Sequence, residues 1–161
     1  MMPQEIRSTI EDFLKTAGFH VADIEERFDP ITESTVFNIL SQDARLLIGR
    51  DGDTVKAMNH LIHKMIDQKI HTQEKKEEFP TFSLDVDDYY KKRFELLKSK
   101  VTLLANRVRS FTVDQALEPM NGYERLMVHH IVGALPDISS ESEGTGRERH
   151  VVLKYTPSSL D

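Results

Sequence analysis

A Gly-x-x-Gly turn between two helix-like segments constrains this chain more than any other feature of its sequence. Gly49 and Gly52 bracket Arg50 and Asp51. Glycines at this spacing allow a tight reversal in which a Cβ would clash, and they let another backbone approach closely. The turn therefore predicts two consecutive helices, with the second one beginning soon after Gly52.

The pattern of apolar residues predicts the other elements of the first half. We expect a helix over about 3–17, strands over 21–28 and 35–40, a short helix ending at 48, a longer helix after 52 and a strand over 82–86. Polar residues of the longer helix are expected to face away from the core: Lys56, Asn59, His60, His63, Lys64 and Asp67. The polar tract 73–78 is predicted to be a solvated loop or a frayed helix end. Three strands under three helices predict a compact α+β sheet covered on one face.

The second half opens with the longest helical pattern of the chain, which starts after residues 87–88. We expect a strand over about 111–117, a helix over 122–134 and strands over 138–142 and 149–155 to follow. Asn121 is a helix N-cap with Glu124 three residues later, the spacing of a capping box. We place a domain boundary near residue 87, which gives domains 1–87 and 88–161. The alternative is that the long helix is shared by both halves as a stiff connector.

Charge and composition exclude several classes of protein. The 161 residues include 21 Lys and Arg against 27 Asp and Glu, a net charge of −6, so nucleic-acid binding would depend on local basic patches. The chain has no cysteine, which excludes disulfides and thiolate metal sites. No apolar run approaches the ~18 residues of a membrane span, and the acidic amphipathic N-terminus does not resemble a secretory signal. These features predict a cytoplasmic protein.

The Gly49–Gly52 turn has the chemistry of a phosphate-binding site. The helix after it begins with unpaired N–H groups and a partial positive charge, which a phosphate oxygen satisfies. Arg50 can pair with a phosphate, and Lys56 follows about one turn later. An isolated Gly-x-x-Gly is more often a plain connector, and Asp51 places an acid where phosphate would approach. We therefore expect Asp51 to weaken nucleotide binding or to restrict it to one backbone path.

A second candidate site lies in the helix predicted over 122–134. Arg125 and His129 are four residues apart and share one face of that helix. A guanidinium suits phosphate oxygens, and an imidazole can donate to a second phosphate or stack on a base. Most Arg-x-x-x-His pairs are instead a surface arginine and a histidine satisfied by local hydrogen bonds. Arg147 and Arg149 either extend a basic patch around Arg125 or form a charged strand edge that discourages pairing.

The sequence shows no catalytic or metal-binding constellation. His60 and His63 share a helix face, but no carboxylate is placed to complete a metal site, so solvated histidines are the simpler interpretation. Ser/His/Asp arrangements, Walker-type loops and paired-carboxylate motifs are absent from the sequence. We therefore expect no metal, no cofactor and no enzymatic activity.

The two candidate sites together resemble those of a known family. The matching strings are Leu47-Ile48-Gly49-Arg50 with Gly52, Glu118-Pro119-Met120-Asn121, Arg125 with His129, Ser142-Glu143-Gly144 and Arg147-Glu148-Arg149-His150. They are similar to the bacterial Jag proteins, also called KhpB or SpoIIIJ-associated proteins. These proteins join a KH domain to an R-three-H domain, which is named after its Arg-x-x-x-His motif. The resemblance covers nearly the whole chain, although Gly122 stands where the family commonly has proline.

The resemblance implies a fold and a function. The implied fold is a type II KH-like three-stranded sheet with helices on one face, followed by a small α+β R-three-H domain. The implied function is non-catalytic binding of single-stranded RNA in post-transcriptional regulation linked to cell division and envelope growth. We expect the RNA-binding residues to be Gly49, Arg50, Asp51, Gly52, Lys56, Arg125, His129, Arg147 and Arg149. A small KH-domain protein is the implied partner, a homodimer is open, and insertion into a membrane is not expected. The alternative is a protein-interaction module, a partner of a small KH protein, in which RNA binding has degenerated.

Overall fold

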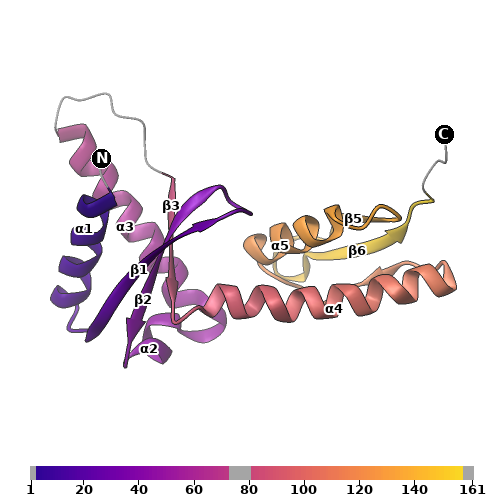
Figure 1. Cartoon of the computed structure of the whole chain (residues 1–161), viewed down its shortest axis with the longest axis horizontal. Helices are drawn as coiled ribbons and strands as arrows, with labels where there is room; N and C mark the ends of the chain where they lie inside the picture. Colours follow the sequence, from indigo (N-terminus) through magenta and orange to yellow (C-terminus); the bar gives the residue numbers. More distant parts are fainter. Residues whose placement is uncertain (1–2, 73–80, 158–161) are drawn as a thin grey trace. The chain divides into compact units, whose positions relative to one another are not determined.

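The computed structural model describes residues 3–72 and 81–157, and the chain divides into two compact units, residues 1–90 and 91–161. Each unit is described by itself (Figure 1). The tract 73–78, predicted to be a loop or a frayed helix end, lies outside the described residues. Unit 1 contains α1 (Pro3–Thr16), β1 (Val21–Asp29), β2 (Ser34–Ser41), α2 (Ala44–Ile48), the 3-10 turn η1 (Arg50–Gly52), α3 (Asp53–Thr72) and β3 (Phe82–Val86), and α4 (Tyr89–Phe111) begins at its end.

The sheet of unit 1 has the strand order β1-β2-β3. β1 and β2 are antiparallel, with Val21 opposite Ser41 and Asp29 opposite Ser34, and β2 and β3 are parallel. Parallel strands cannot be joined by a tight turn, so the chain crosses over through α2, η1 and α3. The predicted order of helix, strand, strand, helix, turn, helix and strand is confirmed.

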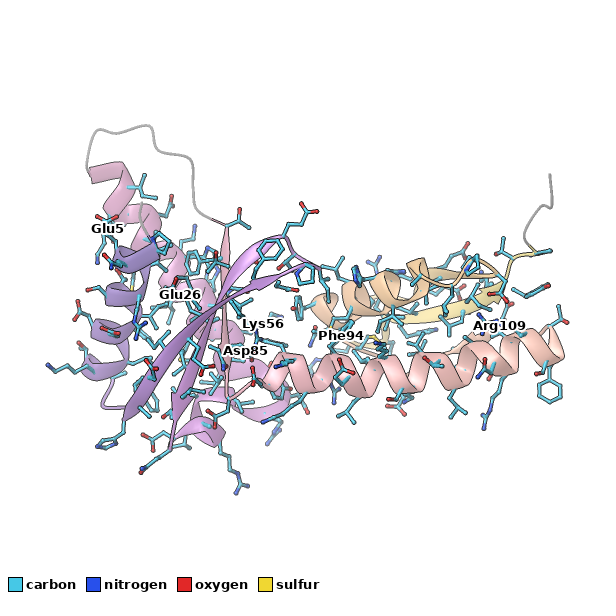
Figure 2. All side chains as sticks on the ribbon, viewed as in Figure 1. Glu5, Glu26, Lys56, Asp85, Phe94 and Arg109 are labelled. Atoms are coloured by element: carbon cyan, nitrogen blue, oxygen red, sulfur yellow. The ribbon has the colours of Figure 1, made fainter. Side chains whose placement is uncertain are left out.

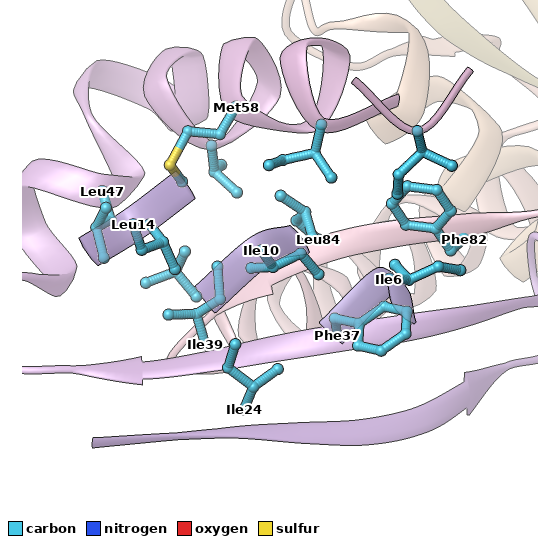
Figure 3. Close-up of a cluster of buried hydrophobic side chains, with 14 of the residues drawn as sticks. Ile6, Ile10, Leu14, Ile24, Phe37, Ile39, Leu47, Met58, Phe82 and Leu84 are labelled. Atoms are coloured by element: carbon cyan, nitrogen blue, oxygen red, sulfur yellow. The ribbon is translucent and has the colours of Figure 1, made fainter. Parts of the chain in front are cut away.

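The helices of unit 1 cover one face of this sheet (Figures 1 and 3). Alternate strand residues lie in the core with the helices: Ile24, Phe37, Ile39, Phe82, Leu84 and Val86. The helices contribute Ile6, Ile10, Leu14, Leu47, Val55, Met58, Ile62 and Ile66. Full burial of one such side chain contributes about 1.5–3 kcal/mol. Because Leu47 of α2 and Val55 of α3 are both in this core, the turn between these helices is held in a fixed place beside the sheet.

The prediction that Asn59 and His63 face away from the core is wrong. Asn59 Oδ1 accepts a hydrogen bond from the Leu84 amide at 3.0 Å, and His63 Nε2 lies 2.9 Å from the Phe82 carbonyl oxygen. Both contacts are made to the outer edge of β3, which is the last strand on that side of the sheet. Helical spacing places these residues near the border of the buried face, and only the position of β3 determines that they contact the sheet.

Unit 2 contains most of α4, then β4 (Gln115–Ala116), α5 (Gly122–Gly133), β5 (Ile138–Glu143), the 3-10 turn η2 (Gly146–Glu148) and β6 (His150–Tyr155). Its sheet is antiparallel with the order β4-β6-β5, and α5 packs on β5 and β6. Both helices and the two longer strands supply buried apolar side chains: Leu97, Val101, Val108, Met127, Val128, Ile131, Ile138, Val151 and Leu153. Unit 2 is a small α+β domain, as predicted.

The strand predicted over 111–117 is much shorter in the structure. α4 continues to Phe111, Thr112 has a left-handed φ of +53°, and only the two residues of β4 pair with β6. Phe111 and Val113 are 73% and 55% exposed, so the apolar residues that indicated a strand have no buried face to occupy. The helical pattern of α4 therefore extends through the region where a strand was predicted to begin.

α5 begins at the predicted capping box, which is confirmed. The Asn121 side chain accepts a hydrogen bond from the Glu124 amide at 3.0 Å, and the Glu124 carboxylate accepts one from the Asn121 amide at 3.1 Å. The same carboxylate binds Nε of Arg93 on α4 at 2.5 Å. The start of the helix that carries Arg125 is thereby fixed to α4.

A second ion pair connects the other end of α4 to the sheet of unit 2. Arg109 donates two hydrogen bonds to the Asp137 carboxylate, at 2.5 and 2.7 Å (Figure 2). These bonds from the guanidinium hold the pKa of Asp137 below its ordinary value. Asp137 immediately precedes β5, so the ion pair fixes the start of that strand relative to α4.

Candidate nucleic-acid interface

The Gly49–Gly52 loop reverses the chain through left-handed backbone conformations. Gly49, Asp51 and Gly52 have φ values of +73°, +50° and +82°. The Gly49 amide donates to the Arg45 carbonyl at 3.1 Å and so ends α2, and α3 begins directly after the loop. Left-handed φ favours glycine, and aspartate tolerates it better than most other residues. The three residues with left-handed φ are therefore residue types that tolerate this conformation.

The surroundings of the loop also require both glycines. A Cβ at Gly49 would lie 2.1 Å from Thr54 Oγ1 and 2.8 Å from the Thr54 backbone nitrogen, and a Cβ at Gly52 would lie 2.9 Å from Tyr89 Cε1. Gly52 is buried and Gly49 is half-buried. The glycine backbone is therefore largely covered, and a ligand at the loop would mainly meet the side chains of Arg50 and Asp51.

The backbone around Tyr89 is fixed by a buried carboxylate of the sheet. Asp85 lies on β3 (Figure 2), and its Oδ1 accepts a hydrogen bond from the Tyr90 amide at 3.0 Å. Its Oδ2 binds Nη2 of Arg27 at 2.6 Å, and the Asp85 side chain is almost fully buried. Because Asp85 holds the first turn of α4, it also places the Tyr89 ring against Gly52 and limits how far the loop can move.

The loop presents one positive and one negative side chain to solvent. Arg50 and Asp51 are exposed, and neither side chain has a hydrogen bond or an ion pair with another described residue. Lys56 in the first turns of α3 (Figure 2) is also exposed and has no such partner in the part of the chain that the structure covers. A phosphate at the loop would meet two cations and one carboxylate, so Asp51 offsets part of the attraction.

His129 on α5 is held by two serines of β5. Its Nδ1 lies 2.7 Å from Ser140 Oγ, and its Nε2 lies 2.9 Å from Ser142 Oγ. Burial, and after it the charge of Arg125, lowers the pKa of His129, so the ring is neutral near neutral pH and one nitrogen donates while the other accepts. A phosphate can bind this ring only by displacing a serine hydroxyl. In this structure His129 fixes α5 to β5, and the predicted phosphate contact competes with that role.

The contacts of Ser140 and Ser142 with His129 were not predicted from the sequence. They stand two residues apart in a strand and so share one face of it, which was the available signal. Helical spacing shows which residues share a face with His129, but it does not show which strand that face contacts.

Arg125 lies beside the segment that leads into α5. Its Nη1 donates to the Met120 carbonyl oxygen at 2.8 Å, and the Met120 amide donates to the Arg149 carbonyl oxygen at 3.1 Å. The Arg125 side chain and the Arg149 main chain thus contact the same residue, and Arg147 precedes Arg149 by two positions, in η2. We call Arg125, Arg147 and Arg149 the arginine cluster. A guanidinium has five N–H groups, so Arg125 has further donors for a ligand beyond its bond to Met120.

The other two members of the arginine cluster are open to solvent. Arg147 and Arg149 are exposed, and their side chains have no hydrogen-bonded or ionic partner within residues 3–72 and 81–157. β6, which follows them, is the central strand of its sheet and is paired on both sides. The interpretation that these arginines protect a free strand edge therefore does not apply to β6, and the basic-patch interpretation fits their position.

The two units differ in charge. Residues 1–90 contain 10 Lys and Arg against 18 Asp and Glu, a net charge of −8, and residues 91–161 contain 11 against 9, a net charge of +2, which together give the −6 of the whole chain. The loop therefore lies in a strongly acidic unit, whereas the arginine cluster lies in a weakly basic one. Attraction of a polyanion favours unit 2.

Neither a metal site nor a membrane span is found among the described residues. No group of three or more His, Cys, Asp or Glu side chains there could hold a metal ion, and His63 of the His60-x-x-His63 pair is hydrogen-bonded to the Phe82 carbonyl. Among the helices described, none combines the length and the apolar character that crossing a bilayer requires.

Comparison with known proteins identifies the class of unit 2. Residues 97–155, from within α4 to the end of β6, match the R-three-H domain family. Residues 97–155 are therefore an R-three-H domain, and the Arg125-x-x-x-His129 pair lies within them.

The chain as a whole is similar to curated bacterial proteins that are named RNA-binding protein KhpB. The protein of Clostridium symbiosum is 24% identical over 131 residues, which cover 81% of this chain and 56% of that protein. The protein of Bacillus subtilis strain 168 is 27% identical over 121 residues, 74% of this chain and 55% of that protein. The protein of Streptococcus pneumoniae strain D39 is 28% identical over 109 residues, 66% of this chain and 31% of that protein. The chain is similar to these KhpB proteins over most of its own length, and it spans just over half the length of the first two.

Proposed function

We propose that this protein binds single-stranded RNA and catalyses no reaction on it. The observation that carries the proposal is the arginine cluster, in which the Arg125 side chain and the Arg149 main chain both contact Met120, within a unit of net charge +2 that contains the R-three-H domain. Guanidinium groups form strong, oriented hydrogen bonds with phosphate oxygens. The names of the curated relatives, which describe them as RNA-binding proteins, support the same function.

In this proposal, Arg125, Arg147 and Arg149 bind the RNA backbone, and His129 contributes mainly by positioning them. His129 is bonded to two serines of β5, and β5 leads directly into η2. Movement of β5 away from α5 would therefore displace Arg147 relative to Arg125.

The loop of unit 1 is proposed as a second contact with the same RNA strand. We assign phosphate binding there to Arg50 and Lys56, with Gly49 and Gly52 shaping the loop that presents Arg50, and we assign a weakening effect to Asp51. KH domains use a Gly-x-x-Gly loop to hold nucleotide backbone, and the order of elements in unit 1 supports this assignment. We propose residues 1–87 as the KH-like domain and residues 88–161 as the R-three-H domain.

The cellular role is proposed from similarity alone. We propose a cytoplasmic protein that acts in post-transcriptional regulation linked to cell division and envelope growth, with a small KH-domain protein as partner and a homodimer left open. The similarity to KhpB proteins supports this role, although the chain matches only part of their length.

The test is an RNA titration with a matched charge control. Fluorescence anisotropy with a labelled single-stranded RNA would compare the wild type with the Arg125→Ala, Arg149→Ala double variant. The control is Lys98→Ala, Arg107→Ala, which removes two exposed cations of α4 in the same unit. We expect the first variant to lose at least about tenfold in affinity and the control about threefold or less, because charge-assisted contacts outweigh general attraction. Equal losses in the two variants would contradict a specific role of the cluster.

The second candidate function is a protein-interaction module. The net charge of −8 in residues 1–90 and the exposed Asp51 in the loop favour it. The variant Arg50→Asp separates the two functions. RNA binding predicts a lower RNA affinity and an unchanged oligomeric state, measured by analytical ultracentrifugation. Altered association with unchanged RNA titrations would favour the interaction module.

A further inference from the structure

Side chains are hydrogen-bonded to three backbone groups on the outer edge of β3. The Leu84 amide donates to Asn59 Oδ1 at 3.0 Å, and the Val86 amide donates to Asp85 Oδ1 at 2.8 Å. The Phe82 carbonyl oxygen accepts a hydrogen bond from His63 at 2.9 Å. A strand at the side of a sheet ordinarily presents unpaired N–H and C=O groups to other molecules. Here three of these groups are already paired.

His63 is held in this position by more than its hydrogen bond. Its ring stacks on the Phe82 ring with the centroids 4.0 Å apart and the planes within 4°. Burial lowers the pKa of His63, so the ring is neutral near neutral pH and Nε2 carries the hydrogen that the Phe82 carbonyl accepts. The contact therefore consists of a stack and a hydrogen bond made by a single side chain.

Asn59 and His63 lie on the same face of α3 as Lys56, which follows the loop. Lys56, Asn59 and His63 follow one another at spacings of three and four residues, which is one face of α3. α3 begins directly after Gly52 and packs on β3. From Gly52 to His63 the helix rises about 16 Å. An RNA strand bound by the loop and by Lys56 would therefore extend along α3 toward the edge of β3.

We propose that Asn59 and His63 determine the specificity of unit 1, because they occupy the backbone groups with which β3 would otherwise recognise bases. Sequence-specific recognition of single-stranded RNA depends on hydrogen bonds to base edges. With the Leu84 amide and the Phe82 carbonyl occupied, the contacts left for an RNA strand on this face are mainly those of the loop and Lys56 with phosphates, so unit 1 binds RNA backbone with little regard to sequence. The inference rests on the proposed function of the loop.

The experiment measures the contribution of the loop separately for each base. Affinities for labelled oligo(U), oligo(C) and oligo(A) are measured for the full-length chain and for its Arg50→Ala variant. For each RNA, the affinity of the chain with Arg50 is divided by the affinity of the variant without it. Because each RNA is compared with itself, differences in its own base stacking cancel. In the wild type we expect this ratio to be above one and equal within about twofold for the three RNAs, since phosphate contacts carry no base information.

The same ratio is then measured in an Asn59→Ala, His63→Ala background, which frees the edge of β3. We expect the three ratios to differ by about fivefold or more, the effect of one gained or lost hydrogen bond. His63→Gln is the matched control, because its amide can still donate to the Phe82 carbonyl, and its ratios should remain uniform. If the double variant fails to fold by circular dichroism, Asn59→Ala alone opens the Leu84 amide, and faster hydrogen exchange of that amide verifies the opening.

Three results would overturn the inference. Wild-type ratios that already differ by about fivefold would mean that unit 1 distinguishes bases despite the closed edge. Uniform ratios in a variant whose Leu84 amide exchanges rapidly would mean that the edge of β3 is not where bases meet the protein. If the Arg50→Ala variant bound every RNA as tightly as the wild type, the loop would have no part in RNA binding and this inference would fail. The proposed role of the arginine cluster would not be affected, because the Arg125→Ala, Arg149→Ala variant tests it separately.

Discussion

Replacing Gly52 by alanine tests how tightly the loop is packed. Gly52 has a φ of +82°, and a Cβ there would lie 2.9 Å from Tyr89 Cε1. A residue with a Cβ in the left-handed region costs roughly 1–2 kcal/mol. Displacing a ring whose backbone is fixed by Asp85 adds about 1–2 kcal/mol, as overpacking does elsewhere. We therefore expect Gly52→Ala to lower the free energy of unfolding by about 2–4 kcal/mol.

Two other glycines separate these contributions. Gly18 has a φ of +83°, and a Cβ there would have nothing within 4 Å, whereas Gly133 at the end of α5 has neither a left-handed φ nor a close neighbour. Gly18→Ala should cost only the backbone part, roughly 1–2 kcal/mol. Gly133→Ala should stabilise by up to about 0.5 kcal/mol, because alanine loses less backbone entropy in a helix. Equilibrium urea unfolding followed by circular dichroism measures all three.

The role of the Tyr89 ring is tested by a double-mutant cycle. Tyr89→Ala removes the atom that the new methyl group would approach, so Gly52→Ala should cost about 1–2 kcal/mol less in that background. The reasoning fails if Gly52→Ala costs no more than Gly18→Ala in the wild type. It also fails if the cost of Gly52→Ala is the same with and without the tyrosine ring, because the contact between the loop and α4 would then exert no constraint.

The remaining predictions concern pH, helix capping and salt. Burial lowers the pKa values of His63 and His129 below 6.5 in the folded state. As the pH falls, these two histidines therefore take up protons more readily in the unfolded chain than in the folded one. Their contribution to stability should be fully present above about pH 6.5 and should be lost as the pH falls through the lowered values, and His63→Gln or His129→Gln should flatten this dependence in urea unfolding. Asn121→Ala removes the capping box of α5 and should cost about 1 kcal/mol, whereas the same change at exposed Asn106, within α4 and hydrogen-bonded to Arg109, should cost about 0.5 kcal/mol or less. The affinity for RNA should fall as salt rises, and Arg149→Ala should reduce the slope of log affinity against log salt by about 0.7, with Arg107→Ala leaving the slope nearly unchanged.

Local sequence rules predicted the features whose causes are local. The glycines at 49 and 52 located the reversal between α2 and α3, because a few adjacent residues determine a left-handed turn. Asn121 and Glu124 located the start of α5 for the same reason, since the capping box is formed by residues three positions apart. The strand predicted over 111–117 was wrong because a strand also requires a partner, and β6 pairs with only two residues of that segment.

The contacts that define the candidate site were harder to predict, because each joins residues far apart in the chain. Asn59 bonds to a strand 25 residues later, and His129 bonds to serines 11 and 13 residues later. Helical spacing restricts such a residue to one face, but the element that covers that face depends on the whole fold. A polar residue near the border of the buried face is therefore the position at which sequence reasoning most often needs the structure.

The uneven charge of the chain determines how both contacts can act on one RNA. At physiological ionic strength, charges separated by more than about 8 Å are largely screened. The −8 of residues 1–90 is therefore felt mainly where acids stand close to the bound strand, as Asp51 does in the loop. The arginine cluster also has an acid nearby, because exposed Glu148 stands between Arg147 and Arg149, but the side chains of these two arginines have no partner in the described structure and their unit is weakly basic. In the proposed function, an RNA strand bound first by the cluster would raise the effective concentration of RNA at the loop, and a weak second contact would then add affinity that it would not supply alone.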